Sequence, residues 1–190
     1  MRLLEGTGAL QSGHFLLSSG LHSPRYVQCA KAVEHPGDAE TLAEEIARRL
    51  GSAGVECVLS PPLGGLIIGY EVARQLGCRF VFPERAENGE FHLRRGFCVE
   101  QGVRAAVVED VITTGRTTRE LVEMLRGIDA NVVAVGAIVD RSGVGEIDGL
   151  PIGSVLTLSI PTYEPEVCPL CQAGVPIVKP GSRRESEAPT

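Results

Sequence analysis

The stretch Val107 to Thr118, VVEDVITTGRTT, runs from apolar residues into two adjacent carboxylates and then into a turn of small polar residues. The segment 104–108 is short and largely apolar, as expected of a parallel strand covered on both faces. Apolar residues then recur at helical spacing, at Leu121, Val122, Met124 and Leu125. The stretch therefore predicts a loop between the carboxyl end of a strand and the amino end of a helix, where open α/β sheets bind ligands.

The residue types in this loop suit a phosphate monoester. The loop offers hydroxyl donors, a glycine that lets the backbone approach an anion, and an arginine that adds positive charge. The residues concerned are Thr113, Thr114, Gly115, Arg116 and Thr117. Free backbone N–H groups and the positive end of the helix dipole attract phosphate at such a place.

The two acids, Glu109 and Asp110, would repel a phosphate, but they are acceptor-only groups that suit the 2′ and 3′ hydroxyls of a ribose. They can also help to hold Mg²⁺ directly or through water. An alternative interpretation is that the acids cap the turn and the threonines act as N-caps. A Walker A loop is excluded because no Gly-Lys-Ser/Thr follows, and no G-x-G-x-x-G fingerprint follows any strand.

The loop resembles the phosphoribosyl-diphosphate (PRPP) loop of the type I phosphoribosyltransferases. Two further stretches are similar to one branch of that family, the orotate phosphoribosyltransferases. HFLLSSGLHSPRY, from His14 to Tyr26, resembles their amino-terminal F-x-L-x-S-G-x-x-S-P-x-Y segment. AIVDR, from Ala137 to Arg141, resembles the strand whose final arginine binds the orotate carboxylate in that family.

This resemblance implies an α/β fold of the type I phosphoribosyltransferase kind, with a central parallel sheet flanked by helices. It implies a single domain over residues 1–180, with a small hood built from about residues 1–30 and the C-terminal segment. The implied reaction transfers the 5-phosphoribosyl group from PRPP to N1 of orotate, giving orotidine 5′-monophosphate and diphosphate, in de novo pyrimidine (UMP) biosynthesis. Mg²⁺ is the implied cofactor. A homodimer is implied because in the family a mobile loop closes over the neighbouring subunit's site.

The resemblance also assigns the site residues. The implied PRPP-binding residues are Glu109, Asp110, Val111, Ile112, Thr113, Thr114, Gly115, Arg116 and Thr117. The implied orotate-binding residues are Thr113, Arg141 and Tyr26, and the implied diphosphate-binding residues are Arg85, Leu63 and Gly64. Asp110 and Arg85 are the implied catalytic residues. No side chain is assigned as a direct metal ligand, and Mg²⁺ would be held through PRPP, Glu109 and Asp110.

Two loops depart from the family's pattern. The loop 60–65, SPPLGG, has Leu63-Gly64 where many members have Tyr-Lys, and it is equally typical of a tight strand-to-helix turn. In the loop 83–95, Arg85 is the one clear match to the family's loop cations, and Asn88-Gly89 indicates a hairpin. With few apolar residues for anchoring, this hairpin is expected to be mobile without ligand. His92 is expected to be exposed to solvent, the alternative being that it faces the site.

The remaining pattern predicts alternating helices and strands. Helices are expected at 38–50 and 65–76, and strands at 55–60, 79–82, 131–139 and 154–160. Connections in a parallel sheet of this kind are right-handed crossovers. The tail, 181–190, is expected to be disordered because it is charged and bears Pro and Ser.

Composition narrows the possible functions. The chain has 190 residues, 43% hydrophobic and 22% charged, with a net charge of −6, which argues against a nucleic-acid surface. No run of 18 apolar residues and no signal-peptide pattern occurs, so we expect a cytoplasmic location and no membrane partner. One alternative function is phosphoribosyl transfer to another base, although neutral bases offer no carboxylate to Arg141. The other is a PRPP-sensing transcription regulator, for which neither the short amino terminus nor the acidic charge supplies a DNA-binding module.

The six cysteines do not suggest a secreted disulfide framework in a chain this large. Cys168 and Cys171 form a C-x-x-C pair, which is half of a zinc knuckle. Because a second pair at similar spacing is absent, a structural or idle thiol pair is the expected interpretation, ahead of zinc.

Overall fold

The computed structural model describes residues 2–17, 19–51 and 53–180. Backbone contacts divide the chain into two compact units. The sheet unit is Cys29–Ser159, and the terminal unit combines Arg2–Gln28 with Ile160–Thr190. The terminal unit contains the segments expected to build the hood, and the expectation of one domain over 1–180 stays a prediction. The tail expected to be disordered, 181–190, lies outside the described residues.

The sheet unit is built on a sheet whose strand order is β4-β3-β7-β8-β10-β9. The parallel strands are β4 (Arg79–Val81), β3 (Cys57–Leu59), β7 (Arg104–Ile112), β8 (Asn131–Asp140) and β10 (Leu150–Thr157). At one edge, β9 (Glu146–Ile147) pairs antiparallel with β10, so the sheet is mixed there. The expected parallel sheet is confirmed for the other strands.

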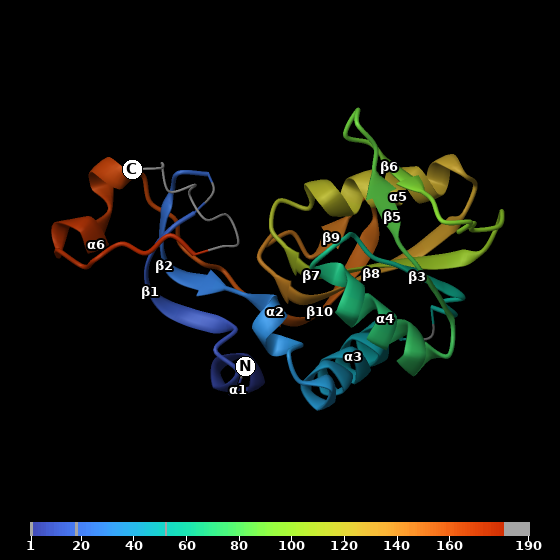
Figure 1. Ribbon diagram of the computed structural model, residues 1–190, viewed down its shortest axis with the longest axis horizontal. Helices are drawn as coiled ribbons and strands as arrows, with labels where there is room; N and C mark the ends of the chain where they lie inside the picture. The colour runs from blue at the N-terminus through green and yellow to red at the C-terminus, as the bar shows by residue number, and fades with distance from the viewer. Residues whose placement is uncertain (1, 18, 52, 181–190) are drawn as a thin grey trace, which may run out of the picture. The chain divides into compact units, whose positions relative to one another are not determined.

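Helices cover both faces of this sheet (Figure 1). The helices α3 (Pro36–Leu50) and α4 (Gly65–Leu76) pack together on one face, and α5 (Arg116–Gly127) packs on the other, against β7 and β8. The short helix α2 (Cys29–Ala32) precedes α3. Pro36 starts α3 because its fixed backbone angle suits a first helical position, and Gly77, with φ of 66°, ends α4 in the left-handed region that glycine tolerates.

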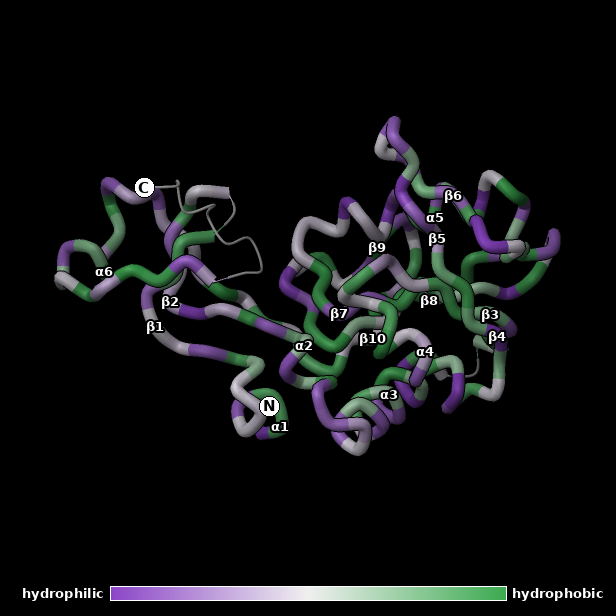
Figure 2. The backbone as a smooth tube through the Cα atoms, viewed as in Figure 1, coloured by the Kyte–Doolittle hydropathy of each residue, from purple (hydrophilic) through white to green (hydrophobic). Residues whose placement is uncertain are grey.

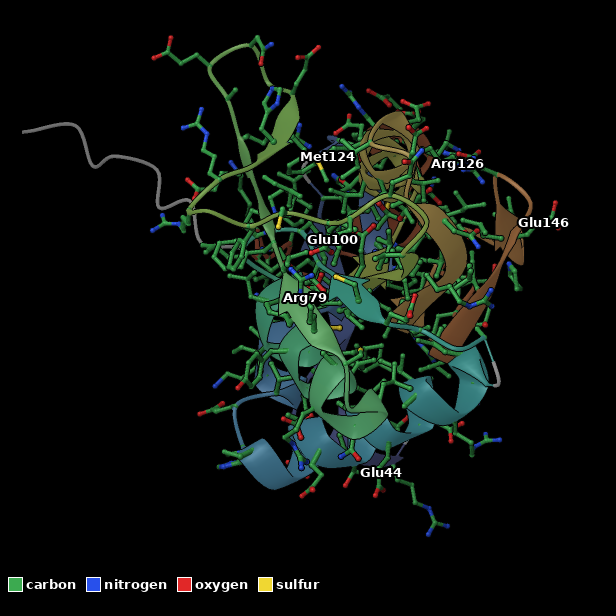
Figure 3. The ribbon with its side chains drawn as sticks, turned by 90° about the vertical axis from the view of Figure 1, so that its right-hand side faces the viewer. Glu44, Arg79, Glu100, Met124, Arg126 and Glu146 are labelled. Atoms are coloured by element: carbon green, nitrogen blue, oxygen red, sulfur yellow. The ribbon has the colours of Figure 1, made fainter. Side chains whose placement is uncertain are left out.

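The core lies between the sheet and its helices. On the α5 side it consists of Leu121, Val122 and Leu125 packed with apolar strand residues such as Val107 and Val135. Figure 2 shows this as hydrophobic stretches along the strands, beside helices that are mixed in character. At the β4 edge, Arg79 pairs with Glu100 at 2.7 Å (Figure 3). Arg79 also donates to the carbonyl of Cys98, which ties residues 98–100 to this edge strand.

The central strand β7 is longer than the sequence predicts. The expected strand stops at Val108, whereas β7 continues in register with β8 through Glu109, Val111 and Ile112. The two acids therefore belong to a strand, and the loop before α5 shrinks to residues 113–115. Carboxylates are uncommon inside a covered sheet, so their presence at this strand end indicates a polar site.

The expected hairpin is confirmed as β5 (Pro83–Arg85) and β6 (Phe91–Leu93), with Gly89 at φ of 85° in its turn. Its base is better anchored than the sequence suggests. Phe91 is buried in the core cluster, Leu93 packs against that cluster, and β6 contacts α5. Mobility without ligand stays a prediction, and it now concerns the tip rather than the whole segment.

The terminal unit joins both ends of the chain. It contains α1 (Arg2–Gly6), the antiparallel strands β1 (Leu10–Leu16) and β2 (His22–Val27), the short 3-10 helix η1 (Pro165–Val167) and α6 (Pro169–Gln172). The C-terminal segment is held to the strands by paired backbone bonds between His22 and Tyr163. A second pair of bonds joins it to β1, where Leu16 N–H donates to Val178 and Val178 N–H donates to His14. Among the described residues, no helix is both long and apolar enough to cross a membrane.

Candidate active site

The chain crosses the sheet in one direction from β3 to β4 and in the opposite direction from β3 to β7 and β8. We call this point the strand reversal. From β3 the chain passes through α4 outward to β4, whereas β7 lies on the other side of β3 and leads on to β8. The crevice outside the carboxyl ends of strands at such a reversal is where open α/β sheets bind ligands. Residues 60–64 follow β3 and residues 113–115 follow β7, so both loops lie at the carboxyl ends of the two strands that flank this point.

The loop after β3 packs directly against the acidic end of β7. A Cβ added to Gly64 would lie 2.5 Å from Oδ2 of Asp110, and one added to Gly65 would lie 2.9 Å from Cδ of Pro61. Side chains do not fit at those distances, so the approach requires glycine at both positions. The peptide bond between Pro62 and Leu63 is cis, and Leu63 is exposed. The loop is thus a tight turn into α4 that also brings backbone close to Asp110.

The two acids lie in different environments. Successive side chains of a strand point to opposite faces, so Glu109 and Asp110 diverge. Glu109 is buried, with 6% of its surface exposed, and accepts a hydrogen bond from the hydroxyl of Thr118 in the first turn of α5. Asp110 is half-buried and faces Gly64. The sequence indicates the acidic pair but not the different environments of the two acids, because nothing in the sequence distinguishes Thr118 from the other small residues of the predicted helix.

Burial shifts the pKa of both carboxyl groups upward. Loss of solvent raises the pKa of Glu109 to about 7, with a smaller contribution from the charge of Asp110, while the hydrogen bond from Thr118 opposes the shift. Loss of solvent likewise raises the pKa of Asp110, against hydrogen bonds from backbone N–H groups. Because both carboxyl groups resist ionisation, a nearby cation or nearby hydroxyl donors would stabilise their charged forms.

The threonine loop, residues 113–115, lies between β7 and α5, as the sequence predicts, but it is shorter than expected. Gly115 precedes α5 with φ of 73°, in the left-handed region, and α5 begins at Arg116. Thr113 and Thr114 are exposed, and the backbone N–H of Arg116 lies 3.4 Å from the hydroxyl of Thr114. The first N–H groups of a helix have no partner within it, so this exposed end of α5 can receive an anion.

Arg141 lies at the carboxyl end of β8, next to the carboxyl end of β7. Its backbone N–H donates to the carbonyl of Ile112 at 2.8 Å, which sets the end of β8 beside the end of β7. The preceding Asp140 is buried and accepts hydrogen bonds from the N–H of Ser142 at 2.8 Å and its hydroxyl at 2.6 Å. Tyr26 belongs to the terminal unit, where its ring lies 5.7 Å from that of Phe15.

Arg85 is held within the hairpin. Its guanidinium lies 3.9 Å from the centre of the Phe91 ring, and Nη2 lies 2.8 Å from Oε2 of Glu120 on α5. The other oxygen of Glu120 accepts from Nε of Arg116 at 2.9 Å. Glu120, which sequence reasoning missed, therefore joins the hairpin to the first residue of α5, next to the threonine loop. His92 is exposed and lies 3.6 Å from Glu90, in agreement with the expectation of a solvent-exposed histidine.

Solved structures with the same fold are phosphoribosyltransferases. The orotate phosphoribosyltransferase of Aeropyrum pernix matches with a TM-score of 0.67 and 26% identity, over 82% of this chain and 92% of that one. The adenine phosphoribosyltransferase of Thermoanaerobacter pseudethanolicus matches with a TM-score of 0.61 and 17% identity, over 70% and 88% of the two chains. Together with the order of the strands and the two loops at the ends of β3 and β7, these matches place the protein in the type I phosphoribosyltransferase class.

Sequence comparison with curated relatives identifies the family within this class. The orotate phosphoribosyltransferase of Thermotoga petrophila is 54% identical over 95% of this chain and 96% of its own length. That of Caldicellulosiruptor bescii is 50% identical over 97% of each chain. The chain belongs to the orotate phosphoribosyltransferase family. A scan against protein-family models finds no match.

Proposed function

We propose that the chain transfers the 5-phosphoribosyl group from PRPP to N1 of orotate, releasing diphosphate, with PRPP bound in the crevice at the ends of β3, β7 and β8. The observation that carries the proposal is the close approach of Gly64 to Asp110. The approach brings the loop after β3 against the acid at the end of β7, and the threonine loop follows that acid directly in the chain. Those three features match the diphosphate, the ribose and the 5-phosphate of a single ligand.

Different residues of the site bind different parts of the two substrates. The half-buried Asp110 accepts hydrogen bonds from the ribose hydroxyls, while Glu109, engaged by Thr118, holds the first turn of α5 in place. The loop 113–117 receives the 5-phosphate, and residues 63–64 receive the diphosphate through backbone N–H groups. Arg141 pairs with the orotate carboxylate, with Thr113 beside it on the neighbouring strand end.

Mg²⁺ fits the donors present, and its use is part of the proposal. Carboxylate oxygens and diphosphate oxygens are the hard ligands that Mg²⁺ prefers. The upward shift in the pKa of Asp110 and Glu109 means that a bound cation would be favourable beside them. When bound, Mg²⁺ neutralises charge that develops on the leaving diphosphate.

Catalysis in this arrangement depends on positioning and electrostatics. The transition state resembles an oxocarbenium ion, so charge stabilisation rather than a protein nucleophile is required. As the N1–C1′ bond forms and the C1′–O bond to diphosphate breaks, the proton on N1 of orotate passes to the departing diphosphate or to water. The crevice residues align the anomeric carbon between the incoming N1 and the departing oxygen. Arg85 supplies positive charge to the diphosphate once it exchanges Glu120 for the ligand.

A homodimer in the cytoplasm completes the proposal. Support for the dimer comes from three exposed apolar side chains at helical spacing on α4 and the loop before it, which we call the α4 stripe: Leu63 (84% exposed), Ile67 (55%) and Tyr70 (61%). Such a stripe on one face of a helix is typical of a protein contact. The cytoplasmic location rests on the sequence expectation alone.

The proposal is tested by following orotate loss spectrophotometrically with PRPP and Mg²⁺, beside adenine, hypoxanthine and uracil. We expect turnover with orotate only, and no turnover when the divalent cation is chelated. Turnover with a neutral base instead would favour another phosphoribosyltransferase. Binding of PRPP without turnover of any base would favour a sensor.

The Asp110→Asn substitution separates chemistry from stability. Because burial disfavours the charged form of Asp110, a neutral amide costs little stability, whereas loss of a charge at the reacting ribose should lower turnover about 100-fold. Turnover and the melting temperature are measured together, with Glu44→Gln on the surface of α3 as the control. A melting temperature lowered by many degrees with turnover retained would make Asp110 a structural cap.

A further inference from the structure

Two histidines and two cysteines meet inside the terminal unit. One ligand atom from each of His14, His22, Cys168 and Cys171 lies within 4.8 Å of every other. Nε2 of His14 lies 2.9 Å from Nδ1 of His22, and Sγ of Cys171 lies 3.7 Å and 3.2 Å from those two nitrogens. Sγ of Cys168 lies 3.6 Å from Nε2 of His14. We call these four residues the Cys2His2 cluster.

These separations match a tetrahedral metal centre. With bonds of 2.0–2.3 Å to a central zinc ion, ligand atoms are separated by about 3.3 Å for two nitrogens and about 3.6 Å for nitrogen and sulfur. The observed 2.9 Å and 3.2–3.7 Å lie within a few tenths of an ångström of those values. Donors of this kind at this spacing are the set that binds Zn²⁺ in structural sites.

The histidine rings are oriented as metal ligands are. Nδ1 of His14 lies 2.7 Å from the carbonyl oxygen of Val175, which can only accept a hydrogen bond. His14 therefore carries its proton on Nδ1, and the lone pair of Nε2 points into the cluster. A hydrogen bond from the remote nitrogen to a carbonyl is the usual support for a zinc-bound histidine. The rings of His14 and His22 meet edge to face at 65°, which aims two nitrogens at one point without stacking the rings.

The terminal unit has little else at its centre. Among its described residues the buried apolar side chains are Leu4, Ala9, Phe15 and Cys168. His14 and His22 are buried with them, at 2% and 7% exposure. Units of this size rarely form a sufficient hydrophobic core and commonly depend on disulfides or metals. All six cysteines are free, so no disulfide takes that role.

We propose that the Cys2His2 cluster binds one structural Zn²⁺ that fastens the C-terminal segment of the chain to the β1–β2 strands. All four coordination positions are filled by protein, so the site is closed and leaves no position for substrate. Binding removes one proton from each thiol and none from the neutral histidines, which gives a centre of zero net charge. That neutrality suits a place where three of the four side chains are buried.

The sequence-based interpretation of a metal-free thiol pair depended on the absence of a second pair of ligands. The structure supplies that pair from the other end of the chain. His14 lies 154 residues before Cys168 and reaches the cluster from β1, at the irregularity between Ser12 and Phe15 where the pairing with β2 shifts. His22 opens β2 and is bonded through its backbone to Tyr163, shortly before the C-x-x-C segment. No local spacing rule could connect ligands so far apart.

Metal analysis of the whole protein is the first test. The chain is expressed without a polyhistidine tag, purified under reducing conditions without chelator, and analysed by mass spectrometry of metals. We expect about one zinc per chain, as for structural sites with four protein ligands. Replacement by Co²⁺ should give the visible absorption of tetrahedral cobalt and a thiolate charge-transfer band.

Variants then assign the ligands. Cys171→Ser is suitable because Cys171 is the exposed member, and His22→Asn removes a nitrogen ligand from the other strand. Both should lose the bound metal, and the charge-transfer band should weaken in Cys171→Ser. Cys98→Ser and His35→Ala, each exposed and outside the cluster, should keep the full metal content.

Metal removal should loosen the terminal unit selectively. Chelation should accelerate hydrogen exchange at the amides of Leu16 and Val178, which bond β1 to the C-terminal segment, and leave the amides of β7 unchanged. The proposal fails if the wild-type protein contains no zinc and binds neither Zn²⁺ nor Co²⁺ on titration. It also fails if mass mapping finds Cys168 and Cys171 joined in a disulfide, or if Cys98→Ser loses as much metal as Cys171→Ser.

Discussion

Adjacent carboxylates in this protein perform different tasks because a strand turns them to opposite faces. Glu109 is buried against Thr118, and Asp110 faces the glycine loop. The pattern of the sequence identifies the pair because a strand, an acidic end and a small-residue loop follow one another locally. It does not separate the two roles, since the partners of each acid come from α5 and from the loop after β3.

The ionisation of Glu109 should make stability depend on pH. Its pKa in the folded protein, about 7, is above the ordinary value of 4.5, so the folded state binds the extra proton. The stabilisation is fully present below pH 4.5 and is lost as the pH rises to 7. The free energy of unfolding should therefore fall across that window by up to about 3 kcal/mol relative to Glu109→Gln.

Urea unfolding of both proteins at a series of pH values measures this difference, with Glu44→Gln as an exposed control. Parallel stability curves for the wild type and Glu109→Gln would mean that Glu109 ionises as freely in the folded state as in the unfolded chain.

Arg141 should determine affinity for the base. The Arg141→Ala substitution removes a charge-assisted pair with the orotate carboxylate, so orotate binding should weaken by about 2 to 4 kcal/mol. PRPP binding should stay near the wild-type value because PRPP binds in the crevice to other residues. Calorimetry with each ligand separates the two effects, and Arg126→Ala at the end of α5 is the matched control. An equal loss for both ligands would contradict the assignment.

Among the elements, the β5–β6 hairpin shows most clearly what a sequence pattern can and cannot determine. Asn88-Gly89 marks the turn because only a few residue types accept its backbone angles. Anchoring was not predictable, since Phe91 and Leu93 are isolated apolar residues in a polar segment and their burial depends on the core beneath them. The extension of β7 past Val108 was missed for a related reason: pairing with β8 overrides the low strand preference of two acids.

Glu120 should control how readily the hairpin opens. It holds Arg85 and Arg116 in two exposed ion pairs, each worth a fraction of a kcal/mol. The Glu120→Gln substitution should therefore raise the rate of tryptic cleavage after Arg85 about five-fold, the effect of about 1 kcal/mol. PRPP with Mg²⁺ should suppress cleavage in both proteins, and orotate alone should not.

The control for this experiment is Glu45→Gln, because Glu45 similarly holds two arginines, Arg48 and Arg49, on α3. An unchanged cleavage rate in Glu120→Gln would show that the hairpin is retained by Phe91 and its strand pairing alone.

At the scale of the whole molecule, the chain's assembly should depend on the α4 stripe. A charge placed in a buried apolar contact is strongly unfavourable, so Ile67→Asp should convert the proposed dimer to monomer. Light scattering coupled to gel filtration gives the mass directly. Val144→Asp is the matched control, because Val144 is a comparably exposed apolar residue outside the stripe. A wild-type protein that is already monomeric, or an Ile67→Asp variant that stays dimeric, would exclude this surface as the interface.

The order of elements along the chain also bears on how the protein is made. The terminal unit takes its strands from residues 2–28 and its closing segment from beyond residue 159. A ribosome that adds roughly 5–20 residues per second needs several seconds or more to synthesise the intervening sheet unit. During that interval the β1–β2 pair is exposed on the nascent chain without the backbone partners that Tyr163 and Val178 later provide. The sheet unit can therefore fold before the residues that complete the terminal unit have been synthesised.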